Sequence, residues 1–234
     1  MNKEEFINEL SKLKIVLTEE QLNQLEKYCK FLINENNKYN LTAITEKESI
    51  YLKHFYDSLT ICKIIKLDNQ SLCDIGTGAG FPGIVLKIAF PHLKVMLIEA
   101  TGKKCNFLKM IIKELNLKEI EVINERAEIY SKKIREKYDI VTSRAVAPLK
   151  HLLEYSIPLV KINGYYIAMK GNIIKEIENI EIYEKELNIT KIKEITFSLP
   201  KENSTRNLIM YKKNKLTNLK YPRKYNEIKK KDIM

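Results

Sequence analysis

A glycine-rich stretch at residues 73–86, CDIGTGAGFPGIVL, constrains the fold of this 234-residue chain more than any other part of it. The apolar run SLCDI leads into this stretch and predicts a buried strand, whereas PGIVLKIAF follows and predicts a helix. Glycines between a strand and a helix allow a tight turn in which the backbone can approach a ligand closely. The stretch therefore predicts an α/β fold with a nucleoside-binding turn.

The segments around this turn predict the rest of the sheet. Short apolar runs continue as LKVMLIE, IEVIN, YDIVTS and YYIAM, with helix-like segments among them over 103–115, 148–160 and 173–187. This alternation predicts a mostly parallel sheet with helices on both faces. The runs ITKIKEITFSLP and TRNLIMYKK predict a final antiparallel pair, which makes seven strands.

Three segments are predicted along the chain. Residues 3–38 carry apolar positions at helical spacing, and Thr18 followed by Gln21 is typical of a helix N-cap. We therefore expect an N-terminal helical cap over 1–69, a Rossmann-like domain over 70–213 and a flexible, basic C-terminal tail over 214–234.

The glycine turn fits two cofactor fingerprints. Gly76, Gly78 and Gly80 give the DxGxGxG pattern of methyltransferases that use S-adenosylmethionine, whereas Gly78, Gly80 and Gly83 give the GxGxxG pattern of dinucleotide-binding enzymes. A carboxylate at the strand end would repel a pyrophosphate at the helix N-terminus, but it favours the cationic amino group and sulfonium of S-adenosylmethionine. Asp74 therefore favours the methyl donor as cofactor.

Two further positions follow strand ends. Glu99, at the end of the next predicted strand, is placed to accept hydrogen bonds from both hydroxyls of a ribose. Because the same acid suits NAD, it indicates a nucleoside without choosing between the cofactors. Arg144, after the fourth predicted strand, could bind a substrate phosphate, a guanine edge or the cofactor carboxylate, and a surface salt bridge is the alternative.

Two sequence motifs of base-modifying methyltransferases are missing near this crevice. The chain has no [DN]PP[YF] sequence, which binds an exocyclic amino group, and no Pro-Cys pair to attack C6 of a pyrimidine. Methylation of the amino groups of adenine or cytosine, and C5-methylation, are therefore disfavoured.

The positive charge is concentrated toward the C-terminus. The chain has a net charge of +11, and residues 212–234 alone hold nine basic and two acidic residues. A basic segment of this kind favours a polyanionic partner such as RNA, but a solvated tail would have the same composition. Charge alone leaves both interpretations open.

Several classes of protein are disfavoured by what the sequence lacks. No apolar run approaches the ~20 residues that cross a membrane, and the N-terminus lacks the apolar block of a signal peptide, so we expect a cytoplasmic protein without a membrane partner. The four cysteines form no CxxC pair and the three histidines show no HExxH or HxxxH spacing. We therefore expect neither a disulfide framework nor a metal site.

Seven motifs in order resemble those of one known family. They are NLTAI (40–44), HFYDSL (54–59), DIGTGAGFPGIVL (74–86), ERAE (125–128), SRAVAPL (143–149), MKG (169–171) and YPRK (221–224). Together they resemble the ribosomal small subunit methyltransferase G family, also called glucose-inhibited division protein B, from about residue 20 to 224. The resemblance implies a class I S-adenosylmethionine-dependent methyltransferase fold and N7-methylation of one guanine in 16S rRNA. The ending YNEIKKKDIM departs from the family pattern.

Site residues follow from the motifs and the resemblance. The expected cofactor-binding residues are Asp74, Gly76, Gly78, Gly80, Phe81, Glu99, Ala127, Glu128 and Arg144. His54 and Asp57 lie three apart on a predicted helix and face the same side, which makes them, with Arg144, candidates for positioning the substrate, although a structural role for His54 is an equal expectation. Lys170, Arg223 and Lys224 are candidates for RNA binding, and Lys170 could instead be solvated.

The leading hypothesis is a monomeric methyltransferase that acts on 16S rRNA or the small ribosomal subunit. The alternatives are a methyltransferase for a non-RNA substrate, a NAD-dependent oxidoreductase that uses the GxGxxG pattern, and a non-catalytic RNA-binding module. Because the nucleoside site is expected in the central sheet, deletion of residues 212–234 is expected to leave cofactor affinity nearly unchanged.

Overall fold

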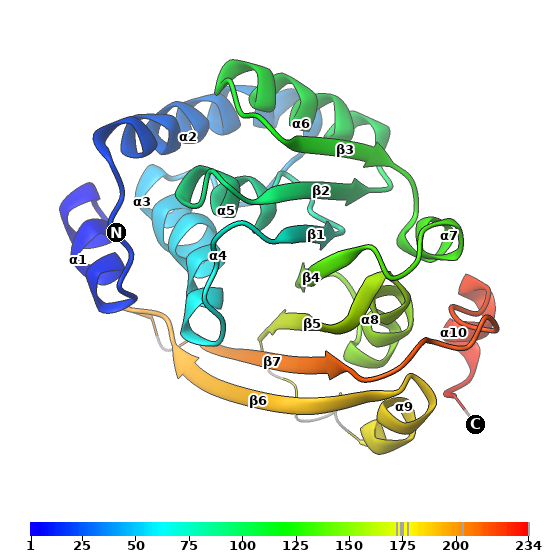
Figure 1. The fold of residues 1–234 in the computed structure, drawn as a ribbon. Coiled ribbons are helices and arrows are strands. Elements are labelled where there is room, and N and C mark those ends of the chain that lie inside the picture. Colours follow the sequence, from blue (N-terminus) through cyan, green and yellow to red (C-terminus); the bar gives the residue numbers. More distant parts are fainter. Residues whose placement is uncertain (172, 174–175, 177, 203, 234) are drawn as a thin grey trace.

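One seven-stranded sheet organises the chain, in the order β3-β2-β1-β4-β5-β7-β6 (Figure 1). The computed structural model describes residues 1–171, 173, 176, 178–202 and 204–233. The strands are β1 (Ser71–Ile75), β2 (Lys94–Glu99), β3 (Ile120–Asn124), β4 (Tyr138–Arg144), β5 (Val160–Lys170), β6 (Ile189–Ser198) and β7 (Thr205–Lys213).

The pairing of the strands confirms the predicted fold class. Strands β1 to β5 pair in parallel, and β7 pairs antiparallel with both β5 and β6. The order of the strands reverses at β1, which lies between β2 and β4. In an open α/β sheet, such a switch point leaves a crevice at the carboxyl ends of the strands, where ligands bind.

Helices cover both faces of the sheet. Successive strand residues point to opposite faces, so their side chains pack against different helices. Leu72 packs in one hydrophobic cluster and its neighbour Cys73 in the other. The first cluster joins the sheet to α1 (Lys3–Lys12), α2 (Glu19–Tyr39), α5 (Gly83–Ala89) and α6 (Gly102–Glu114). The second joins it to α7 (Ala127–Lys133), α8 (Leu149–Ser156), the short 3₁₀ helix η3 (Ile157–Leu159), α9 (Ile180–Glu186) and α10 (Tyr225–Lys230).

Helix α2 begins where its predicted cap places it. Thr18 accepts a hydrogen bond from the Gln21 backbone, and Gln21 bonds back to the Thr18 backbone, which forms the predicted capping box of α2. A continuous helical segment follows and consists of α3 (Lys47–Ile50), a π-helical turn η1 (Tyr51–Tyr56), α4 (Asp57–Leu59) and a 3₁₀ turn η2 (Thr60–Lys63). This segment carries His54 and Asp57, and π-helical turns are frequent at functional sites.

Helices α7 and α9 differ from those expected. Helix α7 was not predicted, because the two large apolar residues of its sequence AEIYSKK, Ile129 and Tyr130, are adjacent and set no helical period. The helix expected over 173–187 is described only as α9, over Ile180–Glu186, and part of the prediction lies outside the described residues.

The C-terminal segment, residues 214–233, packs on the molecule, and the prediction of a flexible tail is wrong. Tyr221 is buried and its hydroxyl donates to Glu186 at 3.0 Å. Arg135 donates to the carbonyl oxygens of Thr217 and Tyr221, each at 2.8 Å. The red helix α10 lies beside α7 and α8 in Figure 1. The boundaries at 69/70 and 213/214 stay predictions.

Among the described residues, no helix combines the length and apolar character needed to cross a membrane.

Candidate active site

Two adjoining cavities lie at the carboxyl ends of the parallel strands. The first, called here the Glu99 cavity, has a volume of about 380 Å³ and lies beside the ends of β1, β2 and β3. The second, called the Arg144 cavity, has a volume of about 520 Å³ and lies between β4, β5 and β7 and the helical segment over 47–63. Gly76, Gly78, Lys104 and Ala145 line both cavities, so a ligand can reach from one into the other.

The glycine turn after β1 has a backbone that side chains disfavour. Gly76, Gly78 and Gly80 have φ values of +64°, +62° and +100°. A Cβ atom at Gly76 would lie 2.7 Å from Val146, whereas a Cβ at Gly78 would meet nothing within 4 Å. Gly78 therefore faces the open space of the cavities, while Gly76 allows the turn to pack against the end of β4.

Gly80 supports the turn from behind. A Cβ there would lie 2.6 Å from both Ile84 and the Tyr28 hydroxyl, and Gly80 lines neither cavity. Tyr28 of α2 donates its hydroxyl hydrogen to the carbonyl oxygen of Ala79, and its ring stacks on Phe81 with centroids 5.5 Å apart. The N-terminal helices thus hold the glycine turn, a contact that the sequence did not reveal.

Asp74 lies beneath the turn and faces neither cavity, whereas the sequence predicted that it would bind the cofactor. It is fully buried and lines neither cavity. One oxygen, Oδ2, accepts hydrogen bonds from Thr77 Oγ1 at 2.5 Å and from the Gly83 backbone at 2.8 Å. Burial raises the pKa of Asp74 to about 6. Asp74 therefore holds the turn in shape. Any attraction between its carboxylate and a cationic cofactor acts across the protein atoms that lie between them.

Glu99 lies at the edge of the Glu99 cavity, at the end of β2. Its two oxygens accept hydrogen bonds from the backbones of Gly78, at 3.0 Å, and Thr101, at 2.8 Å. Each carboxylate oxygen has a second lone pair, so both can also accept from a ligand hydroxyl. Ala127 and Glu128 line the same cavity at the start of α7, and Glu128 forms an ion pair with Arg126.

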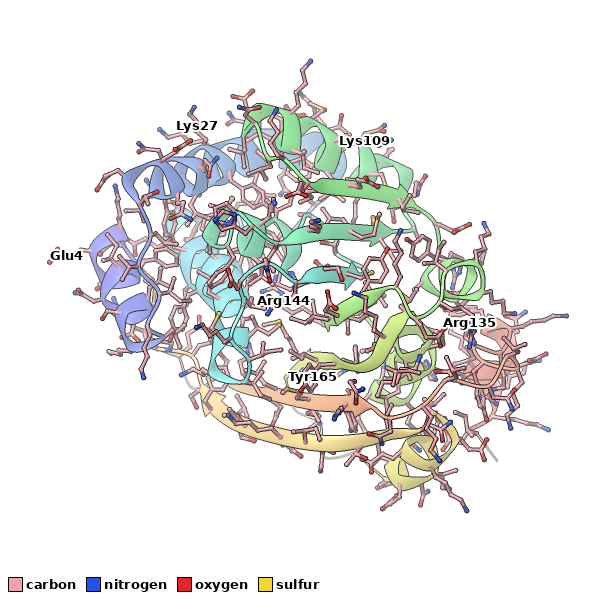
Figure 2. All side chains as sticks on the ribbon, viewed as in Figure 1. Glu4, Lys27, Lys109, Arg135, Arg144 and Tyr165 are labelled. Carbon is pink, nitrogen blue, oxygen red and sulfur yellow. The ribbon has the colours of Figure 1, made fainter. Side chains whose placement is uncertain are left out.

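Arg144 is the central side chain of the Arg144 cavity, and it lies near the middle of the view in Figure 2. Its Nη1 donates to the Lys53 carbonyl oxygen at 2.8 Å and to Asp57 at 3.2 Å. The guanidinium also lies 5.3 Å from the Phe81 ring centroid. Phe81, expected among the cofactor-binding residues, lines this second cavity. The salt bridge weighed as an alternative for Arg144 exists, but it lies in the crevice and not on the surface.

Asp57 joins two arginines across the Arg144 cavity. It accepts from Arg144 and also from Arg206 Nε, which lies 3.1 Å from each carboxylate oxygen. Arg206 comes from β7 and was not among the predicted site residues. No sequence pattern marks it, because it is one basic residue among 41 and meets Asp57 only through the fold.

His54 is a neutral, packed histidine. Its ring stacks on Phe81 with centroids 4.3 Å apart. Arg144 Nη2 lies 3.2 Å from His54 Nδ1, and because arginine can only donate, Nδ1 must accept. The ring proton is then on Nε2, which donates to Thr42 Oγ1 at 2.8 Å. Burial, together with the positive charge of Arg144, lowers the pKa of His54 to about 3.

Basic side chains outnumber acids around the Arg144 cavity. Lys53, Lys104, Arg144, Lys170 and Arg206 line it, and Asp57 is the one acid among its described lining residues. Such a concave, positively charged surface attracts anions.

The three RNA-binding candidates occupy different environments. Lys170 is buried and donates to Ala147 at 2.7 Å while pairing with Glu176 at 2.8 Å, so it is neither solvated nor free to meet a phosphate. Arg223 pairs with the fully buried Glu154 at 2.8 Å, which makes it an anchor of the C-terminal segment. Lys224 is exposed at the start of α10.

Comparison with known proteins identifies the family. A family model described as rRNA small subunit methyltransferase G matches residues 21–210. The ribosomal RNA small subunit methyltransferase G of Bacillus cytotoxicus is 48% identical over 229 residues, covering 96% of this chain and 95% of that protein. The chain belongs to this family. It is therefore an S-adenosylmethionine-dependent methyltransferase, which confirms the expected cofactor and excludes the oxidoreductase and the non-catalytic module.

Solved structures of low sequence identity agree on the fold. A precorrin-6y C5,15-methyltransferase from Geobacter metallireducens has a TM-score of 0.53 at 13% identity and covers 77% of this chain and 96% of its own. An S-adenosylmethionine-dependent methyltransferase from Aquifex aeolicus has a TM-score of 0.52 at 15% identity, with 76% and 97% covered. The class I methyltransferase fold is confirmed.

The residues of the Glu99 cavity fit the nucleoside of S-adenosylmethionine. Open space lies in front of Gly78, carboxylate lone pairs are available at Glu99, and apolar side chains from Ile98 and Val146 line the cavity.

Among the described residues, no group of three or more His, Cys, Asp or Glu side chains could hold a metal ion.

Proposed function

We propose that this enzyme methylates N7 of one guanine in 16S rRNA of the small ribosomal subunit, and that it does so as a cytoplasmic monomer. Family membership supports an rRNA substrate, since the relatives are named for ribosomal RNA of the small subunit. The cofactor-binding roles given to the residues of the Glu99 cavity, and the positioning roles of Arg144, Asp57 and His54, belong to the same proposal.

The observation that carries the proposal is the lack of a free general base in the Arg144 cavity. His54 is neutral with a pKa of about 3, and hydrogen bonds occupy both of its ring nitrogens. Asp57 is held by two arginines. Among the described lining residues, therefore, no histidine or carboxylate is placed to remove a proton from a substrate.

This environment suits guanine N7 better than an exocyclic amine. S-adenosylmethionine supplies an electrophilic methyl group on its sulfonium. Guanine N7 carries an in-plane lone pair and no proton, so the protein needs to orient it and to exclude water but not to deprotonate it. Arg144 and Arg206 would orient the base or a neighbouring phosphate, because both arginines line the cavity.

Mapping the methyl group tests the proposed function. Small ribosomal subunits and protein-free 16S rRNA are incubated with the enzyme and S-adenosylmethionine, then reduced with borohydride and treated with aniline, which cleaves RNA at N7-methylguanosine. We expect one enzyme-dependent cleavage site in at least one of the two substrates. Methylated RNA that resists this cleavage would contradict N7 as the target, and absence of RNA methylation would contradict the substrate.

The exposed lysines of the C-terminal segment are expected to bind RNA phosphates. If they do, replacing Lys224, Lys229, Lys230 and Lys231 with glutamine reduces the dependence of RNA affinity on salt, because fewer counterions are released. Each lost contact should lower the slope of log K against log salt by roughly 0.7 to 0.9. The slope is measured by filter binding at several salt concentrations.

A control variant separates this effect from overall charge. This variant has the same number of lysines replaced with glutamine, at exposed positions on or near α2 and α6. These are Lys27, Lys109, Lys113 and Lys118. Figure 2 places Lys27 and Lys109 at the outer edge of the molecule, away from Arg144. Equal slopes for the two variants would show that the C-terminal lysines are only solvated.

A further inference from the structure

The C-terminal segment contributes a side chain to the Glu99 cavity. Tyr225, at the start of α10, lines this cavity together with Ala127 and Tyr155. Residues 225–234 are also the part of the sequence that departs from the family pattern. The wall of the cavity on this side is therefore built by a segment outside the central sheet.

The Tyr225 ring is held in place by a chain of contacts. The Arg126 guanidinium lies over the ring, 4.1 Å from its centroid, and the Lys229 Nζ lies 4.9 Å from it. Arg126 is in turn fixed by its ion pair with Glu128, which is 7% exposed. The contacts thus connect α10 to the start of α7, where Ala127 also lines the cavity.

The rest of the segment is anchored to the second face of the sheet. Ile228 and Ile233 are buried in the hydrophobic cluster of that face. Arg223 pairs with Glu154, and Asp232 pairs with Lys150 at 2.6 Å. These contacts lie on both sides of Tyr225 in the sequence, so they hold its backbone beside the cavity.

The cavity at Tyr225 has the character of a purine site. Glu125, Arg126 and Ala127 follow β3 and line the cavity, and Ala127 is one of the positions at which the family resemblance implies cofactor binding. Tyrosine offers a large apolar face at a low cost in conformational entropy, and aromatic contacts stabilise planar groups such as a purine. The ribose position at Glu99 lies in the same cavity.

We propose that Tyr225 is a cofactor-recognition residue that closes the cavity over the adenine of S-adenosylmethionine. The C-terminal segment is therefore part of the cofactor site. This revises the expectation that deleting residues 212–234 leaves cofactor affinity nearly unchanged. The proposal concerns the cofactor alone and holds whichever substrate receives the methyl group.

Binding measurements with two ligands test the proposal without catalysis. S-adenosylhomocysteine is the product that the cofactor becomes after methyl transfer, and it has both a nucleoside and an amino-acid part. 5′-Methylthioadenosine keeps the nucleoside and lacks the amino-acid part. Calorimetry should show that Tyr225→Ala weakens both ligands by the same factor, roughly 10-fold, because both lose the same aromatic contact. Tyr225→Phe should bind both within about twofold of the original protein, since the ring remains.

The controls distinguish a lost wall from a loosened helix. Asn226→Ala changes the adjacent exposed residue, which does not line the cavity, and should leave both affinities unchanged. A fall of more than about 3 °C in the ligand-free thermal midpoint of Tyr225→Ala would indicate a loosened helix. Tyr225→Leu then replaces it as the test, because leucine keeps apolar bulk for packing, and it should still weaken the binding of both ligands several-fold. Unchanged affinities in Tyr225→Ala and Tyr225→Leu, or a loss for S-adenosylhomocysteine alone, would overturn the proposal.

Discussion

Replacing Gly78 with valine is expected to abolish cofactor binding, with the affinity for S-adenosylhomocysteine falling by roughly 100-fold or more. The added side chain would extend into open space that the Glu99 and Arg144 cavities share, where we propose that the cofactor lies. Isothermal calorimetry measures the loss. An affinity within threefold of the original would show that the ligand does not pass in front of Gly78.

A second glycine variant serves as the control for stability. Gly80→Ala places its Cβ 2.6 Å from Ile84 and from the Tyr28 hydroxyl, so it should lower the thermal midpoint more than Gly78→Val does. At Gly78 the cost is backbone strain at a φ of +62°, of order 1–3 kcal/mol. The two variants should therefore separate ligand exclusion from damage to the fold.

Replacing Arg144 with alanine is expected to slow single-turnover methyl transfer by roughly 100-fold, the effect of misplacing reacting groups by about 1 Å. Removal of the guanidinium leaves the Lys53 carbonyl oxygen and His54 Nδ1 without their hydrogen-bond donor. Arg144→Lys should recover little, because a single ammonium cannot reproduce the forked contacts.

Cofactor binding by the Arg144 variant separates the roles weighed for this residue. A matching loss of affinity for S-adenosylhomocysteine indicates that Arg144 holds the cofactor carboxylate, and an unchanged affinity indicates that it places the guanine. Lys109→Ala, at an exposed position on α6, is the control and should behave as the original protein. A methyl-transfer rate within threefold of the original in Arg144→Ala would contradict both roles.

The sheet and the glycine turn were predictable because their signals are local. The strand at Ser71–Ile75, the glycines after it and the helix that follows occupy one continuous stretch, and the apolar runs mark the remaining strands. Glu99 could be placed near the turn for the same reason, since parallel strands end at one edge of the sheet. Its hydrogen bond to Gly78 is the contact that this reasoning implies.

The partners of the site residues were not predictable, because they join distant parts of the chain. Asp57, Arg144 and Arg206 come from a helix and two strands, and no spacing in the sequence connects them. The place of Asp74 in the motif was identified, but the contacts of its carboxylate were not. The carboxylate accepts hydrogen bonds from Thr77 and Gly83 beneath the turn.

The C-terminal segment was misjudged because its charge obscured its apolar residues. Tyr225 and Ile228 are three residues apart, a spacing typical of one helix face, and Tyr221 comes before the helix. That weak signal lies among nine basic residues in 212–234, a composition also typical of disorder. The structure buries Tyr221 and Ile228 and places Tyr225 at the Glu99 cavity.

The central claim, that methyl transfer needs no general base, is tested most directly by the pH dependence of the single-turnover rate. With a pKa of about 3, His54 stays neutral throughout the neutral range and cannot change its protonation there. We therefore predict a rate that is nearly flat from about pH 6 to 9 with enzyme, cofactor and RNA fully bound. A first-order rise through the histidine range, abolished in His54→Ala while RNA and cofactor still bind, would contradict the account.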